Sequence, residues 1–103
     1  MITAIVRFKL KPGTTQATAT EMFRNSVPRY QGRAGLVRKY YLFGDGYGGG
    51  VYLWKSRSDA EQLYTPEWRD AIAERYGAPP EITLYESPVI VDNSTQEVLV
   101  DAA

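Results

Sequence analysis

A glycine-rich stretch between two apolar runs constrains the fold of this chain more than any other feature. Five of the nine glycines lie in the segment FGDGYGGGVYLWKS, residues 43–56. A phosphate-binding loop would join a strand to a helix, but here strand-like runs, 36–43 and 49–56, lie on both sides. The GxxxxGK[ST] spacing does not occur in it, and the GxGxxG spacing of residues 44–49 lies between the two strand-like runs. The segment therefore predicts a tight antiparallel β-hairpin.

Hydrophobic periodicity predicts a strand and a helix before this hairpin. Residues 2–10 alternate between apolar and other side chains, as a half-buried strand does. A helical pattern follows, which either Thr14 or Thr15 can cap. Pro28 is expected to end or bend this helix.

A second helix and a last strand are predicted after the hairpin. Ser58 and Glu61 have the spacing of a capping box. The pair Thr65-Pro66 is expected to break the helix and to start a second segment that stops at Gly77. Residues 81–91 are then the fourth strand.

The order β-α-β-β-α-β is typical of the ferredoxin-like α+β fold with an antiparallel sheet. With 103 residues, the chain has the length of one domain. We assign residues 1–91 to that domain and 92–103 to a C-terminal tail. Within the tail, 97–100 could form a short extra strand.

The predicted sheet lacks a polar face. In the third strand, Gly50, Tyr52 and Trp54 share one face, and Val51 and Leu53 share the other. The alternation of the second strand sets Leu36, Tyr40 and Leu42 against Val37, Tyr41 and Phe43. An antiparallel sheet with one wet face should alternate cleanly. We therefore expect helices on one face and a second copy of the chain on the other, in a twofold homodimer.

Composition excludes several classes of function. The chain has 12 basic and 12 acidic residues, and no His and no Cys. The charge balance argues against nucleic-acid and anionic-membrane partners. Thiolate chemistry, cysteine zinc sites and a histidine base are impossible. Carboxylates alone could hold Mg²⁺ or Ca²⁺, but they are scattered. No signal-peptide or membrane-helix pattern is found, so a cytoplasmic location is expected.

Two motifs carry a resemblance to a known family. Residues 35–41 (GLVRKYY) and 49–56 (GGVYLWKS), with Ala60 beyond them, resemble the YdhR-type mono-oxygenases. That family is related to the antibiotic-biosynthesis mono-oxygenases of the dimeric α+β barrel superfamily. The resemblance covers about residues 1–91 and includes ERYGAPPEITLYESPVIV.

The resemblance implies a two-subunit barrel with a pocket between sheet and helices in each subunit. It also implies oxidation of a small aromatic, quinol or polyketide-like compound without flavin, haem or metal. In that chemistry the deprotonated substrate itself reduces O₂, and the protein supplies a dry pocket, orientation and a proton acceptor. The broader group has a His ten residues after the motif Trp, where this chain has Tyr64.

Candidate site residues follow from these motifs. Lys39 lies in an apolar strand, where its pKa could fall and its amine act as a base or as a cation beside a carbanion. Tyr64 is the second catalytic candidate. The candidate substrate-binding residues are Tyr41, Tyr52, Trp54, Trp68 and Tyr85. Core or interface packing is the alternative for each, and an edge or interface ion pair is the alternative for Lys39.

Three functions remain open at this stage. The first is the mono-oxygenase that works without a cofactor. The second is a non-catalytic protein, small-ligand-binding or stress-related, on the same dimeric scaffold, with an apolar or aromatic ligand. The third is a different enzyme on this fold, such as an isomerase or cyclase.

Overall fold

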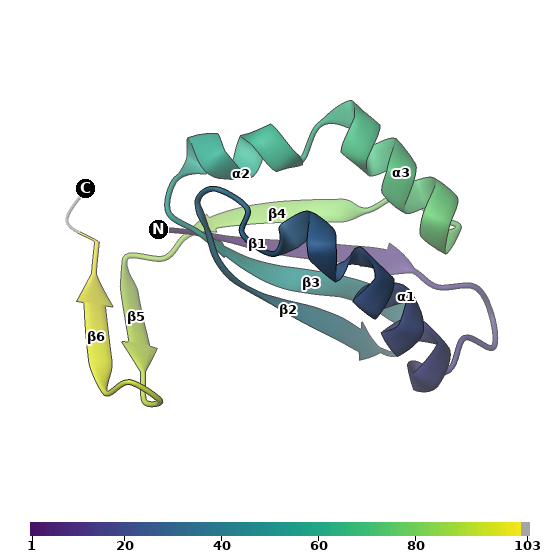
Figure 1. Ribbon diagram of the computed structural model, residues 1–103, viewed down its shortest axis with the longest axis horizontal. Coiled ribbons are helices and arrows are strands. Elements are labelled where there is room, and N and C mark those ends of the chain that lie inside the picture. The colour runs from purple at the N-terminus through teal and green to yellow at the C-terminus, as the bar shows by residue number, and fades with distance from the viewer. Residues whose placement is uncertain (102–103) are drawn as a thin grey trace.

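A computed structural model, described for residues 1–101, contains one four-stranded antiparallel sheet with helices on one face (Figure 1). The strand order is β2-β3-β1-β4. These elements confirm the predicted ferredoxin-like α+β order, with the second helix in two parts. Their bounds are β1 (Ile2–Lys9), α1 (Gln16–Tyr30), β2 (Leu36–Gly44), β3 (Tyr47–Trp54), α2 (Arg57–Leu63), α3 (Pro66–Tyr76) and β4 (Glu81–Glu86).

The glycine-rich segment is the predicted hairpin between β2 and β3. Its turn consists of Asp45 and Gly46, both with positive φ, 52° and 79°. Two such residues form the turn whose twist matches that of paired strands. Because β3 begins earlier than predicted, at Tyr47, the following glycines lie inside the strand.

The boundaries of α1 confirm one prediction and correct another. The Thr15 hydroxyl caps the helix by accepting a hydrogen bond from the Thr18 amide at 3.2 Å. Pro28 does not end the helix, which continues to Tyr30. Pro28 is exposed and lies near the helix end, so its missing N–H removes only one late hydrogen bond.

The second helical region starts at a different cap from the one predicted. Ser56, not Ser58, precedes α2 and accepts a hydrogen bond from the Asp59 amide at 3.1 Å. The predicted break is confirmed, because Thr65 caps α3 and Pro66 occupies its first turn. Gly77 ends α3 in a left-handed conformation, as predicted.

The predicted strand 81–91 is divided in two. Pro88 has no N–H to continue a ladder, and β4 ends at Glu86. The next strand, β5 (Val89–Asp92), pairs with β6 (Glu97–Val100) and not with the sheet. This confirms the extra strand at 97–100. The hairpin β5–β6 extends from the end of the sheet nearest the N-terminus (Figure 1).

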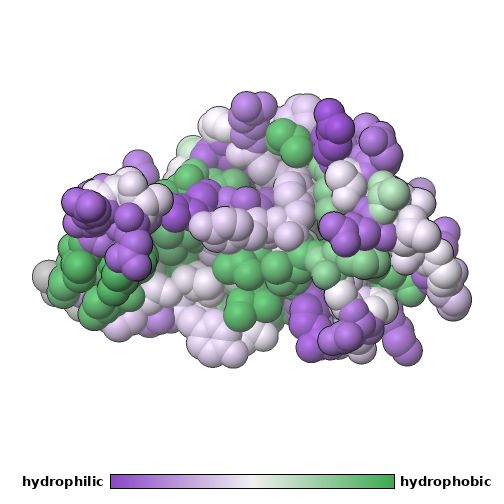
Figure 2. Space-filling view, turned by 90° about the horizontal axis from the view of Figure 1, so that it is seen from below, coloured by the Kyte–Doolittle hydropathy of each residue, from purple (hydrophilic) through white to green (hydrophobic). Residues whose placement is uncertain are grey.

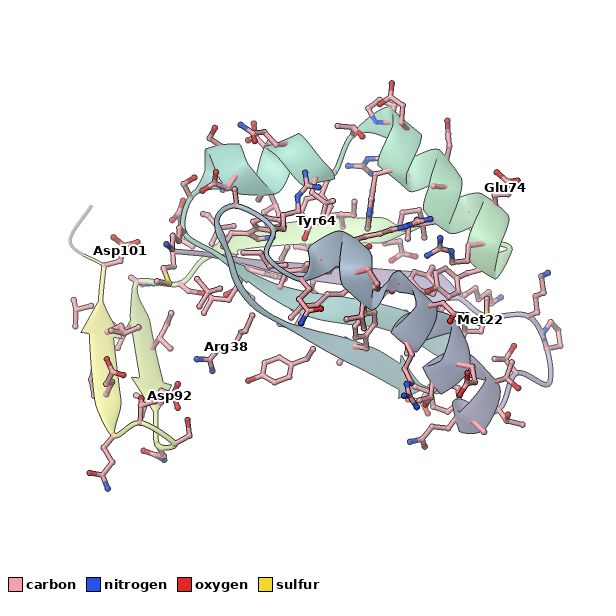
Figure 3. The ribbon with its side chains drawn as sticks, viewed as in Figure 1. Met22, Arg38, Tyr64, Glu74, Asp92 and Asp101 are labelled. Atoms are coloured by element: carbon pink, nitrogen blue, oxygen red, sulfur yellow. The ribbon has the colours of Figure 1, made fainter. Side chains whose placement is uncertain are left out.

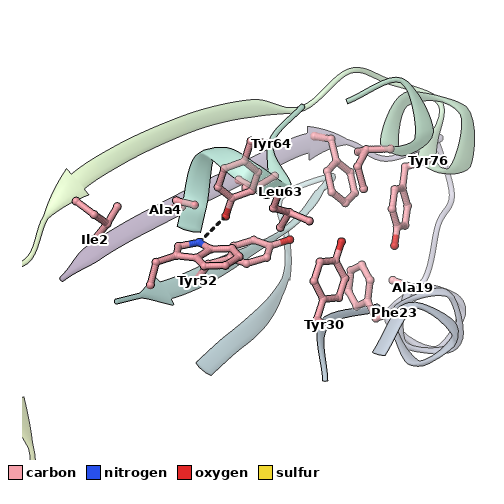
Figure 4. Packing of buried hydrophobic residues seen from close by; sticks show 14 residues of the cluster. Ile2, Ala4, Ala19, Phe23, Tyr30, Tyr52, Leu63, Tyr64 and Tyr76 are labelled. Atoms are coloured by element: carbon pink, nitrogen blue, oxygen red, sulfur yellow. Dashed lines mark hydrogen bonds between the residues drawn. The ribbon is translucent and has the colours of Figure 1, made fainter. Parts of the chain in front are cut away.

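The core lies between the sheet and the helices (Figure 4). The inward side chains of β1 and β3 alternate as predicted, and Tyr52 and Trp54 are almost wholly buried. The buried cluster consists of Ile2, Ala4, Val6, Phe8, Ala19, Phe23, Tyr30, Tyr52, Trp54, Ala60, Leu63, Tyr64, Ile72 and Tyr76.

A β-bulge changes the predicted faces of β2. Leu36 pairs with Trp54 and Arg38 with Leu53, so Val37 is an extra residue in the strand. The bulge places Leu36 on the same face as Tyr41, whereas strict alternation had set them apart. The other predicted members of these faces, Tyr40 and Leu42 against Tyr41 and Phe43, keep their places.

The sheet face away from the helices carries many apolar side chains. Ile5, Val51 and Tyr40 lie side by side across β1, β3 and β2. The hairpin also exposes Val89, Val91, Val98, Leu99 and Val100. Figure 2 shows apolar surface on this hairpin and in the middle of the view. Within residues 1–101, no helix is long and apolar enough to cross a bilayer.

Candidate functional site

Lys39 enters the helix-covered side of the sheet because of its register and because of Gly50. Lys39 pairs with Tyr52 on β3 and shares its inward face. A Cβ at Gly50 would lie 3.1 Å from Lys39 Cε and 3.1 Å from Tyr52 Cε1. The glycine therefore leaves the space through which the lysine stem passes.

Three tyrosine rings surround the Lys39 amine. Lys39 Nζ lies 3.4 Å from the ring centroid of Tyr30, 3.8 Å from that of Tyr41 and 4.5 Å from that of Tyr52. We call these three rings the tyrosine cage. In the described part of the chain, the ion pairs involve Arg38, Arg57 and the amino terminus, not Lys39.

The cage changes the acid–base behaviour of Lys39. Burial, together with the positive charge of Arg75 on α3, lowers the pKa of Lys39 to about 6. The ring faces act in the opposite direction, because they attract the ammonium form. The amine therefore exchanges protons near neutral pH, which a general base requires.

Hydrogen bonds fix two of the cage rings. The Ser26 hydroxyl donates to the Phe23 carbonyl at 2.7 Å, which leaves its oxygen to accept from the Tyr41 hydroxyl at 2.7 Å. Trp68 Nε1 donates to the Tyr30 hydroxyl at 3.1 Å. These bonds hold Tyr41 and Tyr30 in place around the amine.

A Trp–Tyr pair lies behind the cage. Trp54 Nε1 donates to the Tyr64 hydroxyl at 3.1 Å, the contact drawn in Figure 4. Burial is the largest influence on Tyr64 and raises its pKa, although the bond from Trp54 favours the phenolate. Tyr64 therefore keeps its proton at neutral pH and satisfies the indole N–H.

The open space next to the cage lies at the edge between α1 and β2. A pocket of about 330 Å³ is lined by Val27, Tyr30, Gln31, Gly32, Leu36, Val37, Arg38, Lys39 and Tyr41. Deeper between sheet and helices, side chains leave only about 10 Å³ around Lys39 and its ring neighbours. Around Lys39, the room for a ligand is at that edge and not in the aromatic interior.

The structure brings six of the seven candidate residues together. Lys39, Tyr41 and Tyr52 form or enter the cage, and Tyr64 is edge-on to Tyr52 with ring centroids 5.6 Å apart. Trp54 and Trp68 each pack against Tyr64. Tyr85 is the exception, because it pairs with Thr3 on the other sheet face and is 53% exposed.

Sequence reasoning missed four residues that shape this site. Tyr30 was not among the candidates, and Gly50 was placed on one strand face with Tyr52 and Trp54 but was not connected with Lys39. Ser26 follows Met22 and Phe23 at helical spacing, so a polar residue on an apolar stripe was the available signal. Arg75 adjoins the core residue Tyr76, but its influence on Lys39 depends on the tertiary structure.

The described residues offer little for metal binding. Residues 1–101 contain no group of three acidic side chains close enough to hold an ion. The polar residues in the lining of the open pocket are Tyr30, Gln31, Arg38, Lys39 and Tyr41. This set suits proton transfer and the binding of an apolar molecule that carries oxygen atoms.

The sequence matches no protein-family model and no curated protein sequence. Solved structures do share the fold. A protein of unknown function from Nitrosomonas europaea has a TM-score of 0.66 and 19% identity, over 84% of this chain and 87% of its own. A proposed antibiotic biosynthesis monooxygenase from Deinococcus radiodurans has a TM-score of 0.68 and 13% identity, over 89% of this chain and 97% of its own.

A third match has a named chemistry. SnoaB, a cofactor-independent oxygenase from Streptomyces nogalater, has a TM-score of 0.60 and 17% identity, over 84% of this chain and 91% of its own. The fold is therefore the ferredoxin-like α+β fold of the antibiotic-biosynthesis mono-oxygenase structures. The comparisons do not single out the YdhR-type branch.

Proposed function

We propose that this chain is a cofactor-independent mono-oxygenase for a small aromatic, quinol or polyketide-like compound, with Lys39 as the base. The observation that carries the proposal is the Lys39 amine, which is held in the tyrosine cage beside a 330 Å³ pocket. The lowered pKa of Lys39, about 6, gives a neutral amine at pH 7. The fold shared with SnoaB supports the reaction class.

The reaction needs one acidic proton to be removed from the substrate. The Lys39 amine takes a proton from a phenol, or from a CH₂ group activated by a carbonyl, and leaves an electron-rich anion. That anion gives electrons to O₂. For an anthrone-like CH₂, one oxygen atom becomes the new carbonyl, and the other leaves as water with both hydrogens.

The cage and the pocket have separate roles in this proposal. The aromatic and aliphatic walls, including Tyr41, Leu36 and Val37, bind the flat apolar body of the substrate. Tyr52, Trp54 and Trp68 lie behind the first wall and hold the cage in place. Tyr64 positions Trp54 through its hydrogen bond and is not the base.

A second function is favoured by one observation. The space between sheet and helices is almost filled, at about 10 Å³. A protein that binds a small apolar ligand at the outer pocket without catalysis would need no more room. Binding of a hydroquinone that is not consumed would support this alternative.

Oxygen uptake distinguishes the two functions. Metal-free protein is mixed with a panel of hydroquinones and anthrones, and O₂ consumption is measured beside Lys39→Met. Lys55→Met is the matched control, because Lys55 is an exposed lysine directly after the neighbouring strand, β3. We expect uptake by wild type and by Lys55→Met, and at least a 10²-fold lower rate in Lys39→Met. Equal rates in all three proteins would remove Lys39 from the reaction.

We also propose that the outer sheet face forms a homodimer. Tyr40, Val51 and Ile5 are neighbours on that face, and Tyr40 is 56% exposed. Covering them removes apolar surface from water. Light scattering is expected to give twice the 11.6 kDa mass of the chain. Val51→Glu should give the monomer mass, and a wild-type monomer at micromolar concentration would refute the proposal.

A further inference from the structure

Lys39 differs chemically from the other lysines of the chain. Lys9, Lys11 and Lys55 are exposed, whereas Lys39 is half-buried with its amine among three rings. None of the ion pairs among residues 1–101 holds its nitrogen. A desolvated lysine near another cation, here Arg75, is the arrangement that activates an amine as a nucleophile.

Lys39 lies in the wall of the open pocket at the edge between α1 and β2. Lys39, Tyr30 and Tyr41 belong both to the cage and to the wall of the 330 Å³ pocket. Val27, Leu36 and Val37 make much of the remaining wall apolar. A small molecule with an apolar body and one polar reacting group fits this lining.

The cage also suits the product of one particular reaction. An amine that condenses with a carbonyl group becomes an iminium ion, which carries a positive charge. The three ring faces, 3.4 to 4.5 Å from Lys39 Nζ, attract such a charge. Removing an ammonium ion from water costs much free energy. The iminium charge is more diffuse and less strongly hydrated, so its transfer from water to the ring faces costs less.

We propose that Lys39 captures small apolar aldehydes or ketones covalently, as an iminium ion held in the tyrosine cage. The nitrogen lone pair forms a bond to the carbonyl carbon, and the carbonyl oxygen takes a proton while the nitrogen releases one, which gives a neutral carbinolamine. Loss of water, with one further proton from solvent, gives the iminium. Nothing is oxidised or reduced, so the capture needs no O₂ and does not depend on the proposed oxygenase reaction.

Reductive trapping tests this proposal. Full-length protein is incubated at pH 7 without oxygen with benzaldehyde and cyanoborohydride, which delivers hydride to an iminium and makes the adduct permanent. Peptide mass spectrometry then measures the adduct at each amine. We expect at least about tenfold more adduct at Lys39 than at Lys9, Lys11 or Lys55, because its larger neutral fraction favours attack. The amount of adduct at the amino group of Met1 serves as a control for how readily benzaldehyde reacts with an amine outside the cage.

Two variants separate the cage from simple exposure. Tyr41→Leu removes one ring but keeps an apolar wall, so its Lys39 adduct should fall several-fold while the Lys55 adduct stays constant. Gly50→Ala crowds the lysine stem and should also lower the Lys39 adduct. Circular dichroism confirms that each variant is folded. Adduct at Lys39 equal to or below that at the exposed lysines of wild type would overturn the proposal, whatever the result of the oxygen-uptake assay.

Discussion

Two adjacent cations on β2, Arg38 and Lys39, occupy opposite faces of one strand and have opposite chemistry. Arg38 is exposed, and its guanidinium lies 2.9 Å from Asp92 of the β5–β6 hairpin, the pair labelled in Figure 3. Hydrogen bonds to Tyr40 and Asp92 raise its pKa. Lys39 faces inward to three rings, where burial lowers its pKa to about 6. Strand alternation alone makes one cation an anchor and the other a reactive amine.

The largest expected effect tests how firmly the inner face is packed. Trp54→Ala removes a side chain with no exposed surface and leaves the Tyr64 hydroxyl without its donor. We expect a loss of about 3–5 kcal/mol in the free energy of unfolding, measured by urea denaturation. Trp54→Phe keeps most of the ring and should lose clearly less. A loss under about 1 kcal/mol for Trp54→Ala would show that the inner face tolerates a cavity.

The second prediction concerns the charge state of Lys39. Its pKa falls from 10.5 in the unfolded chain to about 6 in the folded one. Between these values the unfolded chain binds more protons, so the free energy of unfolding rises with pH, by up to about 1.4 kcal/mol per pH unit. The rise is absent below pH 6, where both states are protonated.

Lys39→Met should remove that pH dependence. Urea denaturation of wild type and variant between pH 6.5 and 9 measures the difference. At pH 6.5 the variant is expected to be as stable as wild type or more so, because folding removes the proton from most Lys39 amines in wild type and an apolar Met side chain has no such cost. Parallel pH profiles of the two proteins would contradict the lowered pKa.

Gly50→Ala is expected to have a smaller effect on stability and a clear effect on Lys39. The new Cβ would lie 3.0 Å from the Tyr40 carbonyl oxygen as well as close to Lys39 Cε. Overpacking of this kind costs about 1–3 kcal/mol. The displaced amine should regain water, and its pKa, followed by NMR of the lysine side chain, should rise toward 10.5. A pKa that stays near 6 would mean that the stem tolerates the methyl group.

The smallest expected effect belongs to the outer cation. Arg38→Gln removes the ion pair with Asp92. Exposed ion pairs contribute little to stability, so the midpoint of thermal unfolding should stay within error. Amide exchange in 89–100 should become faster, because the hairpin loses its anchor to β2. Unchanged exchange there would show that other contacts hold the hairpin.

Local patterns predicted much of this fold. The turn at Asp45–Gly46, the Thr15 and Thr65 caps and the shared face of Tyr52 and Trp54 all follow from residue types at short spacing. The bulge at Val37 was not predictable in this way, because it depends on how β2 pairs with β3. Pro88 indicated a break in the strand before Val89, but the apolar residues on both sides of it favoured one continuous strand over 81–91.

The sequence predicted which residues belong to the candidate site better than it predicted how they are arranged. Lys39 was singled out as a lysine in an apolar strand, and the structure supplies the three rings around it. The alternation of Ile82 and Leu84 against Tyr85 could have placed Tyr85 on the outer face. Arg75 lies in α3, 36 residues after Lys39, and Tyr30 lies at the end of α1, nine residues before it, and no local pattern connects either residue with Lys39.

The parallel rings of Tyr52 and Trp54 give this protein an optical signature of its own. Their centroids are 6.2 Å apart and their planes differ by 6°. Aromatic side chains that are fixed in an asymmetric environment give a near-ultraviolet circular dichroism signal. Both rings belong to the layer that supports the tyrosine cage, so their contribution to the signal reports the native packing of that layer without any label. It would vanish if the chain kept its helices and strands but lost the fixed order of its interior.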